Sequence, residues 1–192
     1  MIDFTNANTK VTLATNDSAK HLESVGAYAL LGWLTGTIVP LFGFGIMYFG
    51  GRNAPDIPAS GEMNLTVLFL LIGLLCSVAG LIAGAIIGVV MILIRRIHWT
   101  ATIIASPLLG LIWGIVSGGA GGFPVFVVGA LFGAIVAAPF GVLGLLTFAA
   151  LYEPFAHRKG GILGWRKVFF AAVGTLILLM IGELLWFFVI NK

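Results

Sequence analysis

Five long apolar segments constrain this chain more than any other feature of its sequence. Each reaches or approaches the ~20 residues that a helix needs to cross the roughly 30 Å hydrocarbon core of a bilayer. Backbone amides and carbonyls find no water in that core, and the segments lack the alternation of strands, so all five are predicted to be helices. They lie near residues 27–49, 64–94, 99–117, 123–151 and 168–190.

The composition agrees with a location in the membrane. Of the 192 residues, 60% are hydrophobic and 9% are charged, whereas soluble domains have about 25% charged residues. We therefore predict an all-α, polytopic membrane protein, in which residues 27–192 form one compact bundle of five transmembrane helices. Residues 1–26 are polar and are predicted to form a cytoplasmic tail or a short amphipathic helix beginning near Asp17 or Ser18.

The distribution of Lys and Arg predicts an orientation. If the N-terminus is cytoplasmic, eight of the ten basic residues lie on the cytoplasmic side, which leaves Arg52 and Lys192 outside. Because cytoplasmic loops carry an excess of Lys and Arg, we expect a multi-pass protein of the inner cell membrane with an external C-terminus. Six of these residues border the membrane segments, where they either only set the topology or also contact anionic lipids. They are Arg95, Arg96, Arg158, Lys159, Arg166 and Lys167.

The second apolar segment carries a stripe of small residues. They recur three, four or seven positions apart, so they fall within a narrow arc of one helix face. The stripe consists of Thr66, Gly73, Ser77, Gly80, Gly84 and Gly88. Lipid tails are as apolar as the side chains, so helices gain by close contact, and a groove of small residues permits it. We expect other helices to dock on this face.

Similar strings suggest an internal repeat. LLGWLTGTIV begins like LLGLIWGIVS, and GLIAGAIIG resembles GALFGAIVA. These similarities give the hypothesis of a duplicated helical hairpin followed by a single fifth helix. The glycine run at residues 118–122 lacks the Lys and Ser or Thr of a phosphate-binding loop and is predicted to be a tight external turn.

Glu183 is the one ionisable residue well inside an apolar segment. A helical wheel places it away from the most apolar arc, so it is predicted to face protein rather than lipid. No Lys, Arg or His lies at that depth, so we expect a neutral acid that donates one hydrogen bond.

Three interpretations of Glu183 stay open. A structural acid would bond the Trp113 indole, the Ser117 hydroxyl or a backbone carbonyl and so fix helix packing. A proton or cation site would use Glu183 together with the nearby polar groups of Trp113, Ser117 and Thr175. In the third interpretation Glu183 contacts a partner subunit.

A metal site is a further hypothesis for the cytoplasmic side. His98, Glu153 and His157 offer imidazole and carboxylate ligands that suit zinc or iron. However, Pro154 is expected to break the helical register between Glu153 and His157, and three surface ligands rarely suffice. We therefore predict no metal and no cofactor.

The sequence favours a protein that is not an enzyme. Ser106 and Ser117 lie towards opposite ends of the third segment, without a His and a carboxylate to activate either as a nucleophile. The basic residues border membrane segments and form no soluble face for nucleic acid. We expect a structural or assembly subunit that packs against other membrane subunits, or against itself, and against lipids. The alternative is a small channel or carrier that uses Glu183, although few polar side chains are available to line a path.

Overall fold

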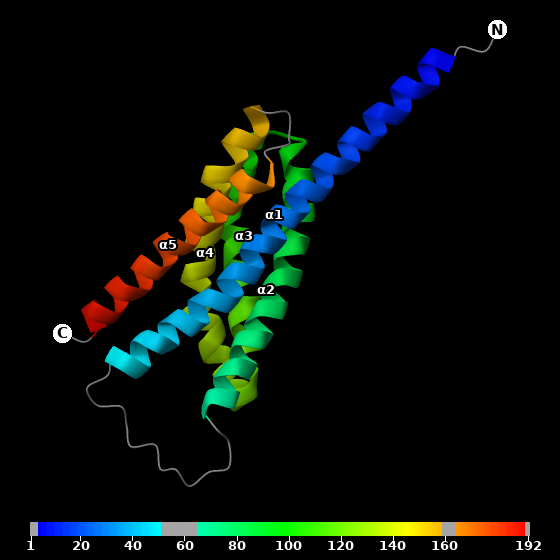
Figure 1. Cartoon of the computed structure of the whole chain (residues 1–192). Coiled ribbons are helices and arrows are strands. Elements are labelled where there is room, and N and C mark those ends of the chain that lie inside the picture. The colour runs from blue at the N-terminus through cyan, green and yellow to red at the C-terminus, as the bar shows by residue number, and fades with distance from the viewer. Residues whose placement is uncertain (1–3, 51–64, 159–163, 191–192) are drawn as a thin grey trace.

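A computed structural model describes residues 4–50, 65–158 and 164–190, and every regular element in these ranges is helical. All five α-helices are long and apolar enough to cross a membrane, which confirms the predicted fold class at this level. Helices α1, α3 and α5 run in one direction and α2 and α4 in the other (Figure 1). The elements are α1 (Phe4–Gly50), α2 (Leu65–Arg95), α3 (Trp99–Gly122), η1 (Phe123–Val125), α4 (Phe126–Arg158) and α5 (Trp165–Ile190).

Helix α1 is longer than the first apolar segment. The polar N-terminal residues from Phe4 onward are continuous with that segment in one helix of 47 residues. No Gly or Pro precedes Gly26, so no residue in this stretch favours a break. The N-terminal part of α1 projects beyond the other helices (Figure 1), and the part apolar enough to cross a membrane begins at Ser18.

Two predicted interruptions are wrong. The glycine run at residues 118–122 forms the last turn of α3, and the chain reverses in η1 instead. The glycines stay helical because α4 packs closely on them: a Cβ added to Gly118 would meet the carbonyl of Gly133. Helix α4 also continues through Pro154 to Arg158. A proline removes one bond to the carbonyl four residues back, and near the end of a well-packed helix this loss is tolerated.

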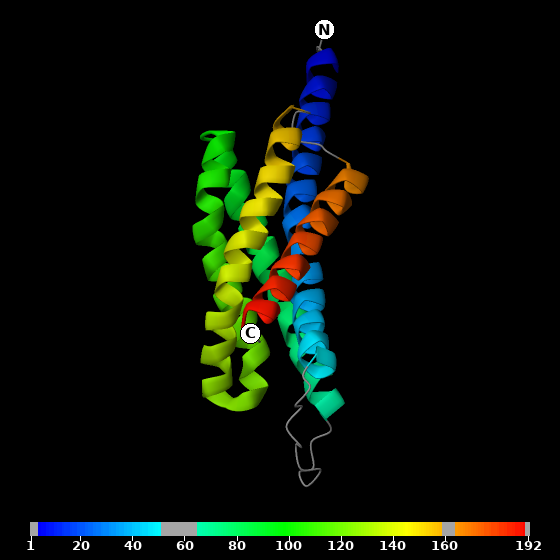
Figure 2. The same cartoon turned by 90° about the vertical axis from the view of Figure 1, so that its left-hand side faces the viewer.

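The helices form two antiparallel hairpins, α1 with α2 and α3 with α4, and α5 packs against α1 and α4 (Figures 1 and 2). Backbones touch in both hairpins, because a Cβ on Gly32 would meet the Gly80 carbonyl and one on Gly110 would meet the Gly141 carbonyl. The hypothesis of a repeat aligns Gly80 with Gly129, yet Gly129 lies against Gly122. The similar strings therefore occupy different positions in the two hairpins.

The most buried side chains gather towards the end of the bundle where α2 and α4 terminate and α5 begins. Tyr28 of α1 packs edge-on against Phe148 of α4, with ring centroids 5.2 Å apart, and Phe148 stacks on Tyr152 at 5.4 Å. Met91 of α2 and Val168 of α5 are fully buried in the same cluster. We call this end of the molecule the basic end, because the Lys and Arg side chains described next lie there.

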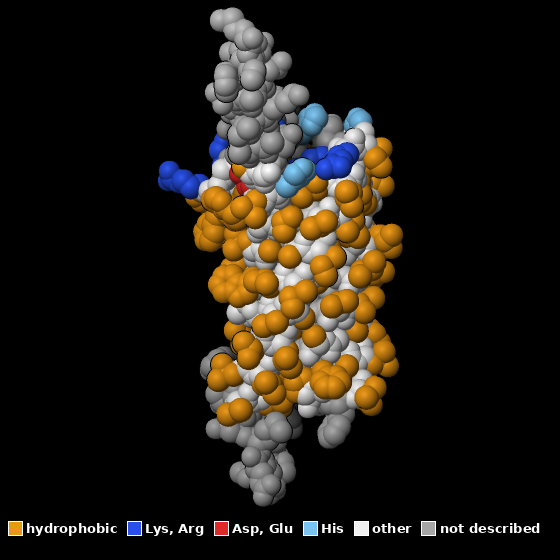
Figure 3. Space-filling view, turned by 90° about the vertical axis from the view of Figure 1, so that its right-hand side faces the viewer, with side chains coloured by type: hydrophobic (Ala, Val, Ile, Leu, Met, Phe, Trp, Pro, Cys, Tyr) orange, Lys and Arg blue, Asp and Glu red, His pale blue; other side chains and the backbone are white. Residues whose placement is uncertain are grey.

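Charged side chains mark the basic end on the surface too. On the face drawn in Figure 3, the Lys, Arg and His side chains lie at this end, and hydrophobic side chains cover the length of the bundle beyond it. An apolar belt of this kind is what helices that face lipid require.

Candidate functional site

A buried ion pair occupies the basic end. Arg95, the last residue of α2, donates from Nε to Oε2 of Glu153 and from Nη2 to Oε1, both at 2.7 Å. The side chain of Glu153 is completely buried and that of Arg95 is 17% exposed. The two parallel hydrogen bonds match the fork of a guanidinium to the two oxygens of a carboxylate, which is the strongest geometry for such a pair.

Helix α1 completes the network. The Tyr28 hydroxyl donates to Oε1 of Glu153 at 2.7 Å, and Nη1 of Arg95 donates to the Ser24 hydroxyl at 2.9 Å. The hydroxyls of Ser24 and Tyr152 lie 3.3 Å apart, and the guanidinium carbon of Arg95 lies 5.6 Å from the centre of the Tyr152 ring. We call Ser24, Tyr28, Arg95, Tyr152 and Glu153 the Arg95–Glu153 network.

This network ties α1, α2 and α4 together with directional bonds. Desolvating two charges is costly, and a buried pair recovers that cost only when further hydrogen bonds satisfy its remaining donors and acceptors. Tyr28 and Ser24 supply such bonds here. The arrangement therefore fixes the relative positions of three helices.

The roles that the sequence predicts for these two charged residues differ from the contacts they make. Arg95 is expected at lipid headgroups, yet three of its nitrogens donate within the protein. For Glu153, His98 and His157, the described residues show no group of three His, Cys, Asp or Glu side chains that could hold a metal ion. His98 instead caps α3, with Nδ1 2.6 Å from the Thr100 hydroxyl. A signal was present in the sequence, since Arg95 and Glu153 follow the ends of two predicted apolar segments on the same predicted side of the membrane.

The other predicted lipid contacts are distributed around the same end. Arg96, Arg166 and Lys167 are exposed. The side chain of Arg158 and the whole of Lys159 lie outside the described residues.

The small residues of α2 face α1. A Cβ on Gly84 would meet the Tyr28 carbonyl, and one on Gly88 would lie 2.8 Å from Cα of Val25. Ser77 accepts a hydrogen bond from Thr37 at 2.9 Å. Gly80 lies against the Gly32 backbone, Gly73 meets only the side chain of Leu41, and the side chain of Thr66 lies outside the described residues.

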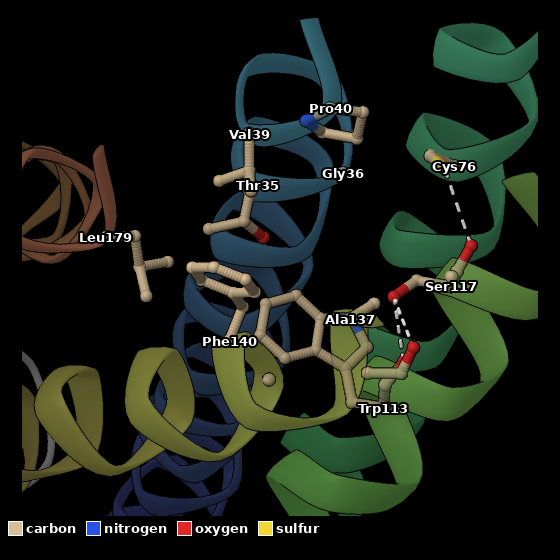
Figure 4. Close-up of a pocket in the computed structure, with 13 residues that line it drawn as sticks. Thr35, Gly36, Val39, Pro40, Cys76, Trp113, Ser117, Ala137, Phe140 and Leu179 are labelled. Atoms are coloured by element: carbon tan, nitrogen blue, oxygen red, sulfur yellow. Dashed lines mark hydrogen bonds between the residues drawn. The ribbon is translucent and has the colours of Figure 1, made fainter. Parts of the chain in front are cut away.

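A small cavity of about 70 Å³ lies near the middle of the bundle. Every helix contributes to its wall: Thr35, Cys76, Trp113, Phe140 and Leu179 come from α1 to α5 in that order (Figure 4). Trp113 is 4% exposed, and its Nε1 is buried with no hydrogen-bond partner among the described residues. One residue of the cavity wall therefore has a hydrogen-bond donor that no described group accepts from.

Glu183 lies one helical turn beyond Leu179, against α1. A Cβ added to Gly43 would be 3.1 Å from Oε1 of Glu183, and Oε2 is buried without a partner among the described residues. The expected bonds from Glu183 to Trp113 or Ser117 are not formed. Ser117 donates to the Trp113 carbonyl in its own helix at 2.9 Å, and Thr175 donates likewise to Ala171.

Taken with their length and apolar composition, the five helices indicate a multi-pass membrane protein. Among the described residues, its polar interior includes the Arg95–Glu153 network at one end and two buried polar atoms without a hydrogen-bond partner, Nε1 of Trp113 and Oε2 of Glu183. Comparison with protein-family models, with curated proteins and with solved structures finds no match for this chain.

Proposed function

We propose that this chain is a non-enzymatic assembly subunit of a membrane complex, with its basic end in the cytoplasm. The proposal rests on two glycines in the C-terminal halves of α1 and α5. A Cβ on Gly45 or on Gly182 would meet no atom of the described residues within 4 Å, unlike one on Gly32 or Gly110. A glycine costs a helix about 1 kcal/mol relative to alanine, and in lipid its benefit is the close approach of another helix.

The hydrogen bonding of hydroxyl groups inside the bundle supports a packing role. The hydroxyls of Thr35, Ser117 and Thr175 all donate to carbonyls of their own helices, at 2.7 to 2.9 Å. A path for a solute needs polar groups that converge on a shared space. The lining of the cavity is largely apolar, and the Arg95–Glu153 network holds three helices together at one end.

Purification of the full chain in a mild detergent tests the proposal. We expect a defined partner chain, or a second copy, to co-purify in fixed stoichiometry. Gly182→Leu should abolish the association by filling the site of close approach. Ala150→Leu is the matched control, because Ala150 is also small but lies at an exposed position on α4, whereas Gly182 is half-buried on α5. A lone monomer, or association that survives Gly182→Leu, would contradict the proposal.

The second candidate is a small proton or cation carrier that uses Glu183. It is favoured by Oε2 of Glu183 and Nε1 of Trp113, which are buried and have no hydrogen-bond partner in the described part of the chain, since unpaired buried polar groups are expensive and are often functional. The purified chain alone in liposomes should then conduct protons or a monovalent cation. Glu183→Gln should abolish this flux and Glu183→Asp should retain part of it. Equal flux by Glu183→Gln and the unaltered chain would exclude this role.

A further inference from the structure

A groove opens between α1 and α5 at the basic end. Its volume is about 410 Å³, and it is lined by Leu30 of α1 and by Trp165, Arg166, Phe169 and Phe170 of α5. Four of these five side chains are aliphatic or aromatic and one is a cation. The lining of the groove is therefore apolar apart from one cation.

The order of these residues along α5 sets the direction of the groove. Helix α5 begins at Trp165, so Trp165 and Arg166 lie at the mouth, on the level of the other basic residues. Phe169 and Phe170 follow one turn deeper, towards the apolar belt, and are 51% and 70% exposed. The Trp165 ring lies over Gly26 of α1, where a Cβ would collide with it, so contact with α1 holds one wall in place.

The charge of Arg166 is available to a ligand. Its side chain is exposed, and the part of the chain that the structure describes forms no salt bridge to it. Glu23 is the nearby carboxylate, but it is 8% exposed and accepts a hydrogen bond from the amide of Gly164 at 3.1 Å. A planar guanidinium matches the oxygens of a phosphate in two parallel bonds.

We propose that this groove binds one anionic phospholipid, with its phosphate on Arg166 and an acyl chain along Leu30, Phe169 and Phe170. A cation at the headgroup level, a Trp at the interface and an apolar track below it are the three features that such a lipid recognises. A free phosphate would use Arg166 alone and would leave the apolar track empty. The site is separate from the Arg95–Glu153 network, whose guanidinium is already engaged.

Lipid retention by the purified full chain tests the site. The chain is exchanged into detergent containing either phosphatidylglycerol or phosphatidylcholine of the same acyl chains, and bound lipid is counted by native mass spectrometry. We expect one retained phosphatidylglycerol and about fivefold weaker retention in Arg166→Gln, which is the effect of one basic residue near a membrane surface. Arg96→Gln is the matched control, because it removes the same charge at the same end outside the groove.

Two further comparisons make the outcome decisive. Phe169→Ala should also lower retention of phosphatidylglycerol, and Arg166→Gln should keep the thermal midpoint of the unaltered chain in lipid-free detergent. Equal losses in Arg96→Gln and Arg166→Gln would show a diffuse surface charge effect and would overturn the proposal. The thermal midpoint of the unaltered chain can also be compared with added inorganic phosphate and with added phosphatidylglycerol. If both raise the midpoint equally, the proposal is overturned too, since the apolar track would then play no part in binding.

Discussion

Arg95 and Glu153 lie 58 positions apart in the sequence, yet they meet in a bidentate ion pair with both N–O distances at 2.7 Å. The pair joins the last residue of α2 to the C-terminal part of α4, and so connects the first helical hairpin directly to the second. Tyr28 adds α1 to the same carboxylate. The two hairpins are therefore bonded to each other at the basic end.

Removal of either charge should destabilise the bundle, but unequally. Arg95→Gln leaves a fully buried carboxylate without its counter-charge, which costs about 3–5 kcal/mol. Glu153→Gln leaves a guanidinium that is 17% exposed and can be partly hydrated, so the loss should be smaller, about 1–3 kcal/mol. The free energy of unfolding in mixed micelles measures both. Arg96→Gln, at an exposed position, should change it by less than about 0.5 kcal/mol, and equal effects of all three variants would contradict the network.

The two tyrosines of the network should differ in the same measurement. Tyr28→Phe removes a 2.7 Å hydrogen bond to a buried carboxylate, and bonds to charged groups are worth about 1.5–3 kcal/mol. Tyr152→Phe removes only a 3.3 Å contact with the Ser24 hydroxyl, so about 0.5–1 kcal/mol is expected. A larger loss for Tyr152→Phe than for Tyr28→Phe would show that the contact between the Tyr152 and Ser24 hydroxyls, and not the bond from Tyr28 to Glu153, contributes more to stability.

Glycine-to-alanine changes should lower the stability of the chain at positions inside the bundle and raise it at a position outside. Gly32→Ala and Gly110→Ala place a methyl group against a facing carbonyl, that of Gly80 or Gly141, and overpacking costs about 1–3 kcal/mol. The methyl group of Gly182→Ala would meet no atom of the structurally described chain within 4 Å, so the isolated chain should gain about 0.5–1 kcal/mol in stability from helix propensity. Thermal midpoints of the purified variants give the signs. Destabilisation by Gly182→Ala in the monomer would mean that its surroundings are tighter than the structure shows.

Helices α2 and α3 should show a compensating pair. A Cβ on Gly121 would collide with Sγ of Cys76, so Gly121→Ala is expected to cost about 1–3 kcal/mol. Cys76→Ala removes that sulfur and should make Gly121→Ala close to neutral. A double-mutant cycle reports the coupling, which for residues in contact is about 0.5–3 kcal/mol. Additive effects would place these two residues out of contact.

The number of helices and their positions along the chain can largely be predicted from the sequence, because length and hydropathy suffice to predict spans in lipid. The five predicted segments correspond to α1 to α5, and their ends differ by a few residues except at the start of α1, which begins at Phe4 instead of near residue 27. The prediction of helix ends fails where local sequence preferences compete with tertiary packing. A glycine run predicts a turn, but in α3 the glycines allow contact between two backbones, as Gly118 with Gly133 shows.

The charge network could not be derived in the same way. Residues at helix ends beside the membrane have an ordinary explanation as topology signals, and only the tertiary structure shows that Arg95 turns inward to Glu153. The location of Glu183 against α1 agrees with its predicted protein-facing side, because its Oε1 approaches Gly43. The predicted hydrogen bond between Glu183 and Ser117 is not formed, since the Ser117 hydroxyl donates to a carbonyl of its own helix.

Cysteine accessibility in oriented vesicles tests most directly whether five helices cross the membrane with the basic end inside. Single cysteines would replace His98, His157 and Phe123 in a Cys76→Ala background; all three are exposed, the first two at the basic end and the third in η1. A membrane-impermeant maleimide should label positions 98 and 157 only in inside-out vesicles and position 123 only in right-side-out vesicles. Labelling of 98 and 157 from opposite sides, or of all three positions from one side, would contradict the account.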